Sequence, residues 1–207
     1  MAQLFFLLLL SLGLAMPLAA QPLPVPGPEQ APRGAPGSPA TKPAVAPEPI
    51  TLNSLFQRLA KARDGAEGRA IARQIEQRWM RSGSDTANLL MTRVLQVETA
   101  KDSETAIELL DYILQLQPQW AEAYNRRATV LFLMDDYDGA LRDIRATLAR
   151  EPRHYGALAG LGMIMQRMGN QKAAYGAFSK ALEIHPQLSD LHAIVERMRP
   201  DVIGRDL

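Results

Sequence analysis

The chain has 207 residues, with 23 basic and 22 acidic side chains, 15 prolines and no cysteine. A formal net charge of +1 offers no overall field for holding a phosphate backbone, which argues against a dedicated nucleic-acid binder. The lack of cysteine excludes disulfides, thiolate metal sites and a cysteine nucleophile, and the aliphatic, ring-poor composition favours packed helices.

An apolar run without Lys or Arg fills residues 1–20. Its most apolar part, Leu4 to Leu14, is about half as long as the roughly 20 residues that span a bilayer, which is typical of a secretory signal peptide. Pro17 then interrupts the helix, and small residues up to Ala20 suit cleavage. We expect a signal peptide, cleaved near Ala20, and a periplasmic or secreted protein. In the alternative, the segment stays uncleaved and anchors the chain as an N-terminal transmembrane segment.

The next stretch, residues 21–49, holds 10 of the 15 prolines. Proline removes backbone donors and favours extended conformations, so this stretch is expected to be a disordered, semi-stiff linker without a packed core. A docking site for a proline-reading domain is the other interpretation.

The remaining chain repeats itself. Three prolines are spaced 34 residues apart: Pro118, Pro152 and Pro186. Three alanines have the same spacing: Ala106, Ala140 and Ala174. Each period contains two amphipathic helical patterns divided by a polar turn, and in the last period Gly169 is expected to be the left-handed residue that ends the first helix.

These residues resemble the tetratricopeptide repeat (TPR) family, whose 34-residue repeat has small side chains where its two helices approach closely and a proline near its end. The resemblance implies an all-α fold, a right-handed superhelical solenoid of antiparallel helix pairs. Its three full repeats are expected at 87–120 (TPR 1), 121–154 (TPR 2) and 155–188 (TPR 3). Three residues depart from the family pattern and predict looser packing in the first two repeats: Val94, Arg127 and Thr147.

Two flanking segments are expected to extend the solenoid. Residues 50–86 read as a degenerate TPR-like helical hairpin, with Leu59, Ala72 and Trp79 in the phase of the repeat. Residues 189–200 read as a capping helix, with Ser189 as its N-cap and Pro200 as its end, followed by a tail at 201–207. Such a helix covers the last open apolar face of a solenoid.

The resemblance also implies a concave groove lined by the first helix of each repeat, where a partner segment binds. Its candidate residues combine apolar, flexible, amide and guanidinium side chains. They are Met91, Leu95, Asn125, Arg126, Thr129, Phe132, Gly156, Gly160, Met163 and Arg167. The other interpretation is that they are ordinary solvent-facing residues. For Gly156 and Gly160 the choice is between tight helix packing and close approach of a ligand backbone.

One known TPR site, the clamp for carboxylate tails, is missing from this sequence. Its basic and amide positions are held here by Met91, Leu95, Arg126, Gly156 and Gly160. A chaperone-tail receptor of that kind is therefore excluded.

We find no catalytic or metal-binding motif. The acidic run from Asp135 to Gly139 resembles part of a calcium loop but lacks the downstream Glu, and the three histidines have no ligand spacing. We expect no enzyme, metal or cofactor. The prediction is an exported, non-catalytic TPR adaptor or scaffold that binds a protein or peptide partner in its groove, binds no nucleic acid, and touches the membrane only if its N-terminal segment is uncleaved. The alternative is a periplasmic assembly or chaperone factor for envelope proteins.

Overall fold

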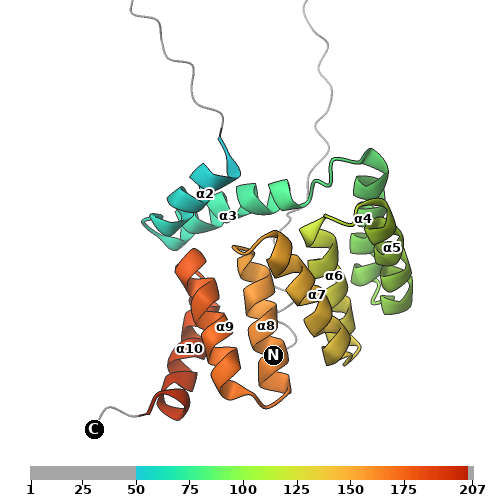
Figure 1. Ribbon diagram of the computed structural model, residues 1–207. Coiled ribbons are helices and arrows are strands. Elements are labelled where there is room, and N and C mark those ends of the chain that lie inside the picture. Colours follow the sequence, from blue (N-terminus) through green and yellow to red (C-terminus); the bar gives the residue numbers. More distant parts are fainter. Residues whose placement is uncertain (1–49, 205–207) are drawn as a thin grey trace, which may run out of the picture.

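The computed structural model describes residues 50–204. The expected signal peptide at 1–20, the linker at 21–49 and the end of the tail, 205–207, lie outside the described residues. The described part is all-helical, as predicted, and its helices are labelled α2 to α10 in Figure 1. They are α2 Leu52–Ala60, α3 Gly65–Trp79, α4 Asp85–Thr99, α5 Ser103–Leu116, α6 Ala121–Leu133, α7 Tyr137–Arg150, α8 Tyr155–Arg167, α9 Gln171–Ile184 and α10 Ser189–Val202.

Three helical hairpins, α4–α5, α6–α7 and α8–α9, follow one another side by side and form the predicted solenoid, and α10 packs against α9 (Figure 1). Among the described helices, none combines the length and the apolar character needed to cross a membrane.

The turn inside each hairpin is built by residues that recur every 34 positions. The residue in the left-handed region is Lys101 (φ 61°), Asp135 (φ 61°) or Gly169 (φ 79°), which confirms the expectation for Gly169. The next residue caps the second helix through its side chain, which accepts a backbone N–H three residues further on. These capping residues are Asp102, Asp136 and Asn170.

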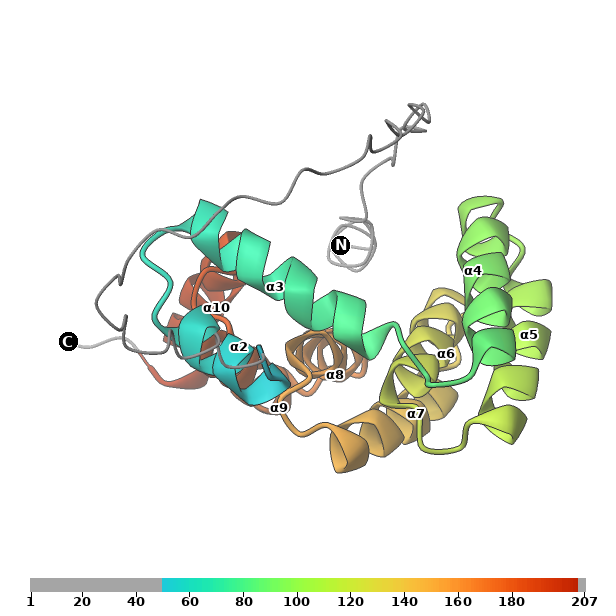
Figure 2. The ribbon, with the colours of Figure 1, turned by 90° about the horizontal axis from the view of Figure 1, so that it is seen from above.

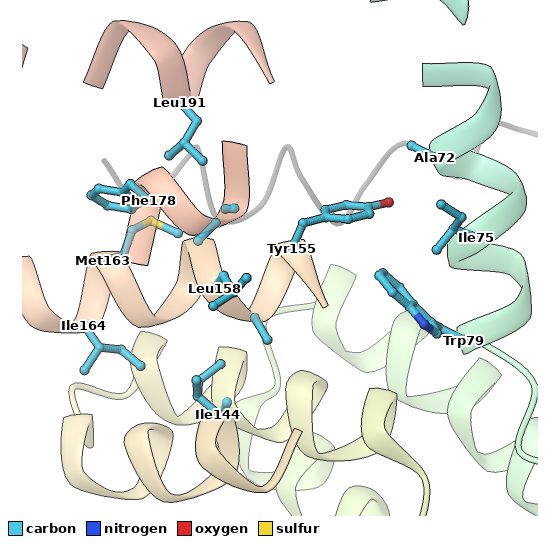
Figure 3. Packing of buried hydrophobic residues seen from close by; sticks show 14 of the residues in the cluster. Ala72, Ile75, Trp79, Ile144, Tyr155, Leu158, Met163, Ile164, Phe178 and Leu191 are labelled. Carbon is cyan, nitrogen blue, oxygen red and sulfur yellow. The ribbon is translucent and has the colours of Figure 1, made fainter. Parts of the chain in front are cut away.

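Small side chains allow the helices of a hairpin to approach closely. Gly162 on α8 faces Phe178 on α9, and a Cβ atom at position 162 would overlap the phenyl ring. The alanines of the repeat are equally enclosed, since Ala106, Ala140 and Ala174 are each 0% exposed. Figure 3 shows Phe178, Met163 and Leu191 meeting in this part of the core.

The side chains at the three positions that depart from the family pattern are buried or ion-paired. Val94 and Thr147 are fully buried. Arg127 forms two ion pairs, with Asp143 at 2.7 Å and Asp111 at 2.6 Å, so its guanidinium joins α6 to α7 and to the preceding α5. Paired charges there replace the apolar contact that the family pattern provides.

The N-terminal hairpin α2–α3 lies across the C-terminal repeats (Figures 1 and 2). Its apolar side chains Leu55, Leu59 and Ile75 belong to the same core cluster as residues of α8, α9 and α10. The Gln187 amide also donates a hydrogen bond to the carbonyl of Ala62 (2.9 Å), and Gly68 faces Gln187 so closely that a Cβ atom would come within 2.9 Å of it.

The outer face of α4 is consequently left open. Leu89 on α4 is 72% exposed, whereas Ala123 and Ala157, at the same repeat position of α6 and α8, are 0% exposed. In the second and third repeats a preceding hairpin covers this position. The spacing of residues 50–86 relative to the repeat therefore predicted a helical hairpin, but it did not predict which helices this hairpin packs against.

The last helix differs from the prediction at both ends. The helix α10 begins at Ser189, so the N-cap is Leu188, which provides no side-chain hydrogen bond. The helix also continues through Pro200 to Val202, because proline in the last turn loses a single backbone hydrogen bond and the Ile203 N–H still reaches the Arg199 carbonyl (2.9 Å).

Candidate functional site

A hollow lies where the first helices of the second and third repeats, α6 and α8, meet the end of α3. Its cavity volume is about 30 Å³, within a space of about 420 Å³ that includes open solvent. Its lining comes from three helices and the residue before α8: Glu76, Trp79, Glu122, Asn125, Thr129, His154, Tyr155, Gly156, Ala159 and Met163. From here on, the hollow is the space lined by these ten residues. The groove is the part of the predicted concave surface that α6 and α8 form around it.

Four of the predicted groove residues line the hollow: Asn125, Thr129, Gly156 and Met163. Gly156 has no packing partner that requires glycine, because a Cβ atom there would meet described side chains only at the ordinary contact distance of 3.5 Å, to His154. Glycine in a helix is less favourable than alanine by about 1 kcal/mol, so internal packing does not account for Gly156.

The other predicted residues lie elsewhere. Arg126 is buried beside the hollow, and Gly160 is buried on α8. Leu95 is half-buried on α4, outside the lining. Met91 is 1% exposed and belongs to the core cluster that α4, α5 and α6 share, which corrects its placement in the groove.

Phe132 and Arg167 form a pair at the far end of the first helices. The Phe132 ring is buried and packs against Tyr137 on α7, with ring centroids 5.6 Å apart. The exposed Arg167 guanidinium lies 6.0 Å from the Phe132 ring centroid. Neither residue lines the hollow.

The floor of the hollow is a buried charge network centred on Glu122. Its carboxylate accepts hydrogen bonds from Arg126 Nε (2.8 Å) and His154 Nε2 (3.0 Å). The other ring nitrogen of His154, Nδ1, accepts the backbone N–H of Ala157 (3.1 Å) at the start of α8, which places the proton of a neutral ring on Nε2. Burial acts to raise the pKa of Glu122, but Arg126 and His154 together outweigh it and lower the pKa.

Two further carboxylates border this network. Burial raises the pKa of Glu76, whose Oε1 accepts a hydrogen bond from the Tyr155 hydroxyl (2.8 Å). Burial also raises the pKa of Glu98, which lies 3.6 Å from Arg126 Nη1. Arg126 thus pairs with Glu122 and Glu98, and its charge also acts on Glu76.

Aromatic rings form the wall on the α3 side. Figure 3 shows Trp79 of α3 and Tyr155 of α8 extending toward one another, and their ring centroids are 5.2 Å apart. Trp79 stacks on the His154 ring, 4.0 Å away and at an angle of 10°. The Trp120 indole donates a 2.6 Å hydrogen bond to the Trp79 carbonyl, which fixes the end of α3 against α6. The Trp79 Nε1 atom itself is buried and has no hydrogen-bond partner within 50–204.

Sequence reasoning missed the contribution of α3 and of the residues at the helix starts. Nothing in the sequence indicated that Glu76 and Trp79 belong to the site, because the spacing of the repeat does not show where the hairpin α2–α3 packs. The positions of Glu122 and His154 in the repeat could have indicated that they belong to the site. They occupy repeat positions 2 and 34, at or just before the N-termini of α6 and α8, where the hollow forms.

The arrangement suits binding and shows no assembled catalytic group. Residues 50–204 hold no cluster of three or more His, Asp or Glu side chains that could ligate a metal ion. The hollow provides carboxylates, amide and hydroxyl groups, aromatic faces and a flexible thioether.

Comparison with known proteins places the chain beside helical-repeat proteins. It is 35% identical over 188 residues to a TPR repeat-containing protein of Rhizobium etli, and the match covers 89% of this chain and 88% of that protein. A stretch of 86 residues is 29% identical to Protein bimA of Emericella nidulans, but the match spans only 11% of that protein. No protein-family model matches the chain.

Solved structures give the same fold. The Sgt2 TPR domain of Aspergillus fumigatus is similar with a TM-score of 0.54 and 18% identity, over 58% of this chain and 81% of that domain. MamA is similar with a TM-score of 0.54 and 19% identity, over 76% of this chain and 88% of MamA. The TPR2B domain of yeast Sti1, solved in a pHsp70 complex, has a TM-score of 0.53 and 15% identity, over 57% of this chain and 99% of that domain.

Proposed function

Because the chain belongs to the tetratricopeptide repeat family, we propose that it is a protein-interaction scaffold that binds a segment of a partner protein in its groove and leaves chemistry to that partner. One observation carries the proposal. The hollow brings together residues that the repeat pattern assigned to ligand contact, among them Asn125, Thr129 and Met163.

The dimensions of the hollow suit part of one anchoring side chain of a longer segment. Its cavity volume of about 30 Å³ is far below the roughly 300–1,000 Å³ of ligand pockets, so the hollow accepts at most part of one side chain, and the surrounding space of about 420 Å³ includes open solvent. The flexible Met163 side chain adapts to varied apolar partners, and the absent side chain of Gly156 allows a backbone to approach α8. A segment lying along the groove would thus insert part of one side chain.

We further propose that the chain is exported, with residues 21–49 as a spacer between the cleavage point and the solenoid. The apolar segment 1–20 supports this proposal. N-terminal sequencing of the protein purified from an envelope fraction is expected to begin at Gln21. An N-terminus at Met1 in membrane pellets would instead support the anchored form.

Photocrosslinking tests the groove. A photoreactive amino acid is introduced at Met163, and a matched control carries it at Lys180, an exposed residue on α9. We expect the Met163 probe to capture one discrete partner from an envelope fraction and the Lys180 probe to capture none. Equal capture by both probes would contradict groove binding. Capture of many unfolded clients would favour an assembly or chaperone factor.

A further inference from the structure

The hollow has more negative than positive charge. Besides Glu76, the charged side chains nearest the hollow are Glu122 and Arg126, and both act on Glu76. Arg126 is already engaged, since its Nε contacts Glu122 at 2.8 Å and its Nη1 lies 3.6 Å from Glu98. Because Arg126 is also 5% exposed, its charge is held within the protein and is not presented to a ligand.

Glu76 is the carboxylate best placed to meet a ligand. It is half-buried on α3 and lines the hollow, and its Oε1 contacts the neutral Tyr155 hydroxyl. Among residues 50–204 no basic side chain forms an ion pair with Glu76, and an ammonium or guanidinium group entering the hollow would provide that partner.

The aromatic wall independently favours a cation. Trp79, one face of which is covered by the His154 ring, and Tyr155 line the same hollow as Glu76, with ring centroids 5.2 Å apart, and aromatic ring faces attract cations. Trp79 is 8% exposed, and its Nε1 donor has no partner among the described residues. A basic side chain of a peptide complements both the carboxylate and the aromatic rings.

We propose that the hollow selects a Lys or Arg side chain from the bound partner segment, with Glu76 as the ion-pair acceptor and the rings of Trp79 and Tyr155 as the wall beside the aliphatic stem. This inference rests on the proposed function of the groove. It predicts partners with a basic residue in the docked segment, the opposite charge preference from a receptor for carboxylate tails.

A titration of the full chain with small probes tests the charge preference. The probes are N-acetyl-lysine methylamide and N-acetyl-arginine methylamide, and N-acetyl-glutamine methylamide serves as the neutral control. The readout is the NMR signal of the Trp79 indole N–H, assigned by its disappearance in Trp79→Phe. We expect the two cationic probes to shift this signal, and the shift to weaken as salt rises.

Substitution identifies the acceptor. Glu76→Gln keeps an acceptor for the Tyr155 hydroxyl and removes the charge, and is expected to raise the Kd of the cationic probes at least about tenfold, or about 1.4 kcal/mol at 25 °C. Glu108→Gln makes the same charge change on the exposed surface of α5 and is expected to leave the Kd unchanged. Equal shifts with the neutral probe, or equal Kd values for both variants, would overturn the inference.

The two proposals can fail separately. If the Met163 crosslink captures a partner but the cationic probes bind no better than the neutral one, the charge inference is wrong and groove binding stands. If the probes bind with the expected dependence on Glu76 while crosslinking captures no partner, the charge preference stands and partner binding in the groove is wrong.

Discussion

Two glycines of the third repeat provide a direct test of the packing. Alanine is more favourable than glycine inside a helix by about 1 kcal/mol. At Gly176 on α9 an added Cβ atom meets nothing within 4 Å, so Gly176→Ala is expected to stabilise the fold by about 1 kcal/mol. At Gly162 the added atom overlaps the ring of Phe178, which is fully buried and has no room to withdraw.

Overpacking of this kind costs about 1–3 kcal/mol. After the propensity gain, Gly162→Ala is expected to range from no net change to a destabilisation of about 2 kcal/mol. The two variants thus differ by about 1–3 kcal/mol, or roughly 2–12 °C in Tm at about 2–4 °C per kcal/mol for a domain of this size. Thermal melts followed by circular dichroism measure the difference. A Gly162→Ala protein that melts as high as Gly176→Ala would refute the assignment of Gly162 to close helix contact.

The remaining predictions concern the charge network. Glu122→Ala leaves the buried Arg126 without its closest carboxylate and is expected to cost about 3–5 kcal/mol in urea unfolding, whereas a loss below about 1 kcal/mol would show that the network is unimportant for stability. Glu76→Gln is expected to stabilise the protein at pH 7. Burial raises the pKa of Glu76 in the folded protein above its unfolded value of about 4.5. The stability associated with protonated Glu76 is therefore fully present below about pH 4.5 and is lost as pH rises through the folded pKa, whereas Gln stays neutral at every pH. The stability advantage of Glu76→Gln should thus vanish near pH 4. Tyr155→Phe removes the 2.8 Å bond to Glu76 and is expected to speed hydrogen exchange in α2 and α3 while α4 and α5 stay unchanged; uniform exchange rates in the variant and the wild type would contradict this anchoring role.

The fold was predictable where the sequence repeats. Residues that recur every 34 positions, such as Ala140 and Ala174, fix which face of each helix points inward, and the helices α4 to α9 follow from that pattern. Position within the repeat does not specify which hairpin lies next to which. The docking of α2–α3 depends on side chains far apart in the sequence, such as Tyr155 and Glu76, and no local signal reports such a contact.

The candidate site was likewise predictable only for residues that lie on the repeats. Asn125 and Met163 lie on the faces of α6 and α8 that the repeat pattern assigns to the groove, and both line the hollow. Met91 occupies the same repeat position as Asn125 but lies on α4, which does not reach the hollow, and there it packs in the core. Trp79 and Glu76 enter the site through the position of α3, which required the three-dimensional structure.

The docking of the first hairpin on the last repeats also has a consequence for the order of folding. Residues that are hydrogen-bonded across this interface are 79 positions apart for Glu76 and Tyr155, 100 for Asn53 and Arg153, and 125 for Ala62 and Gln187. A simple solenoid gains its stability from neighbouring repeats and can grow from one end. The hairpin α2–α3 is synthesised before the segment on which it packs, and closing so long a loop slows folding. These contacts tie the first hairpin to the last repeats, and a chain that stops before Arg153 would lack all three of them.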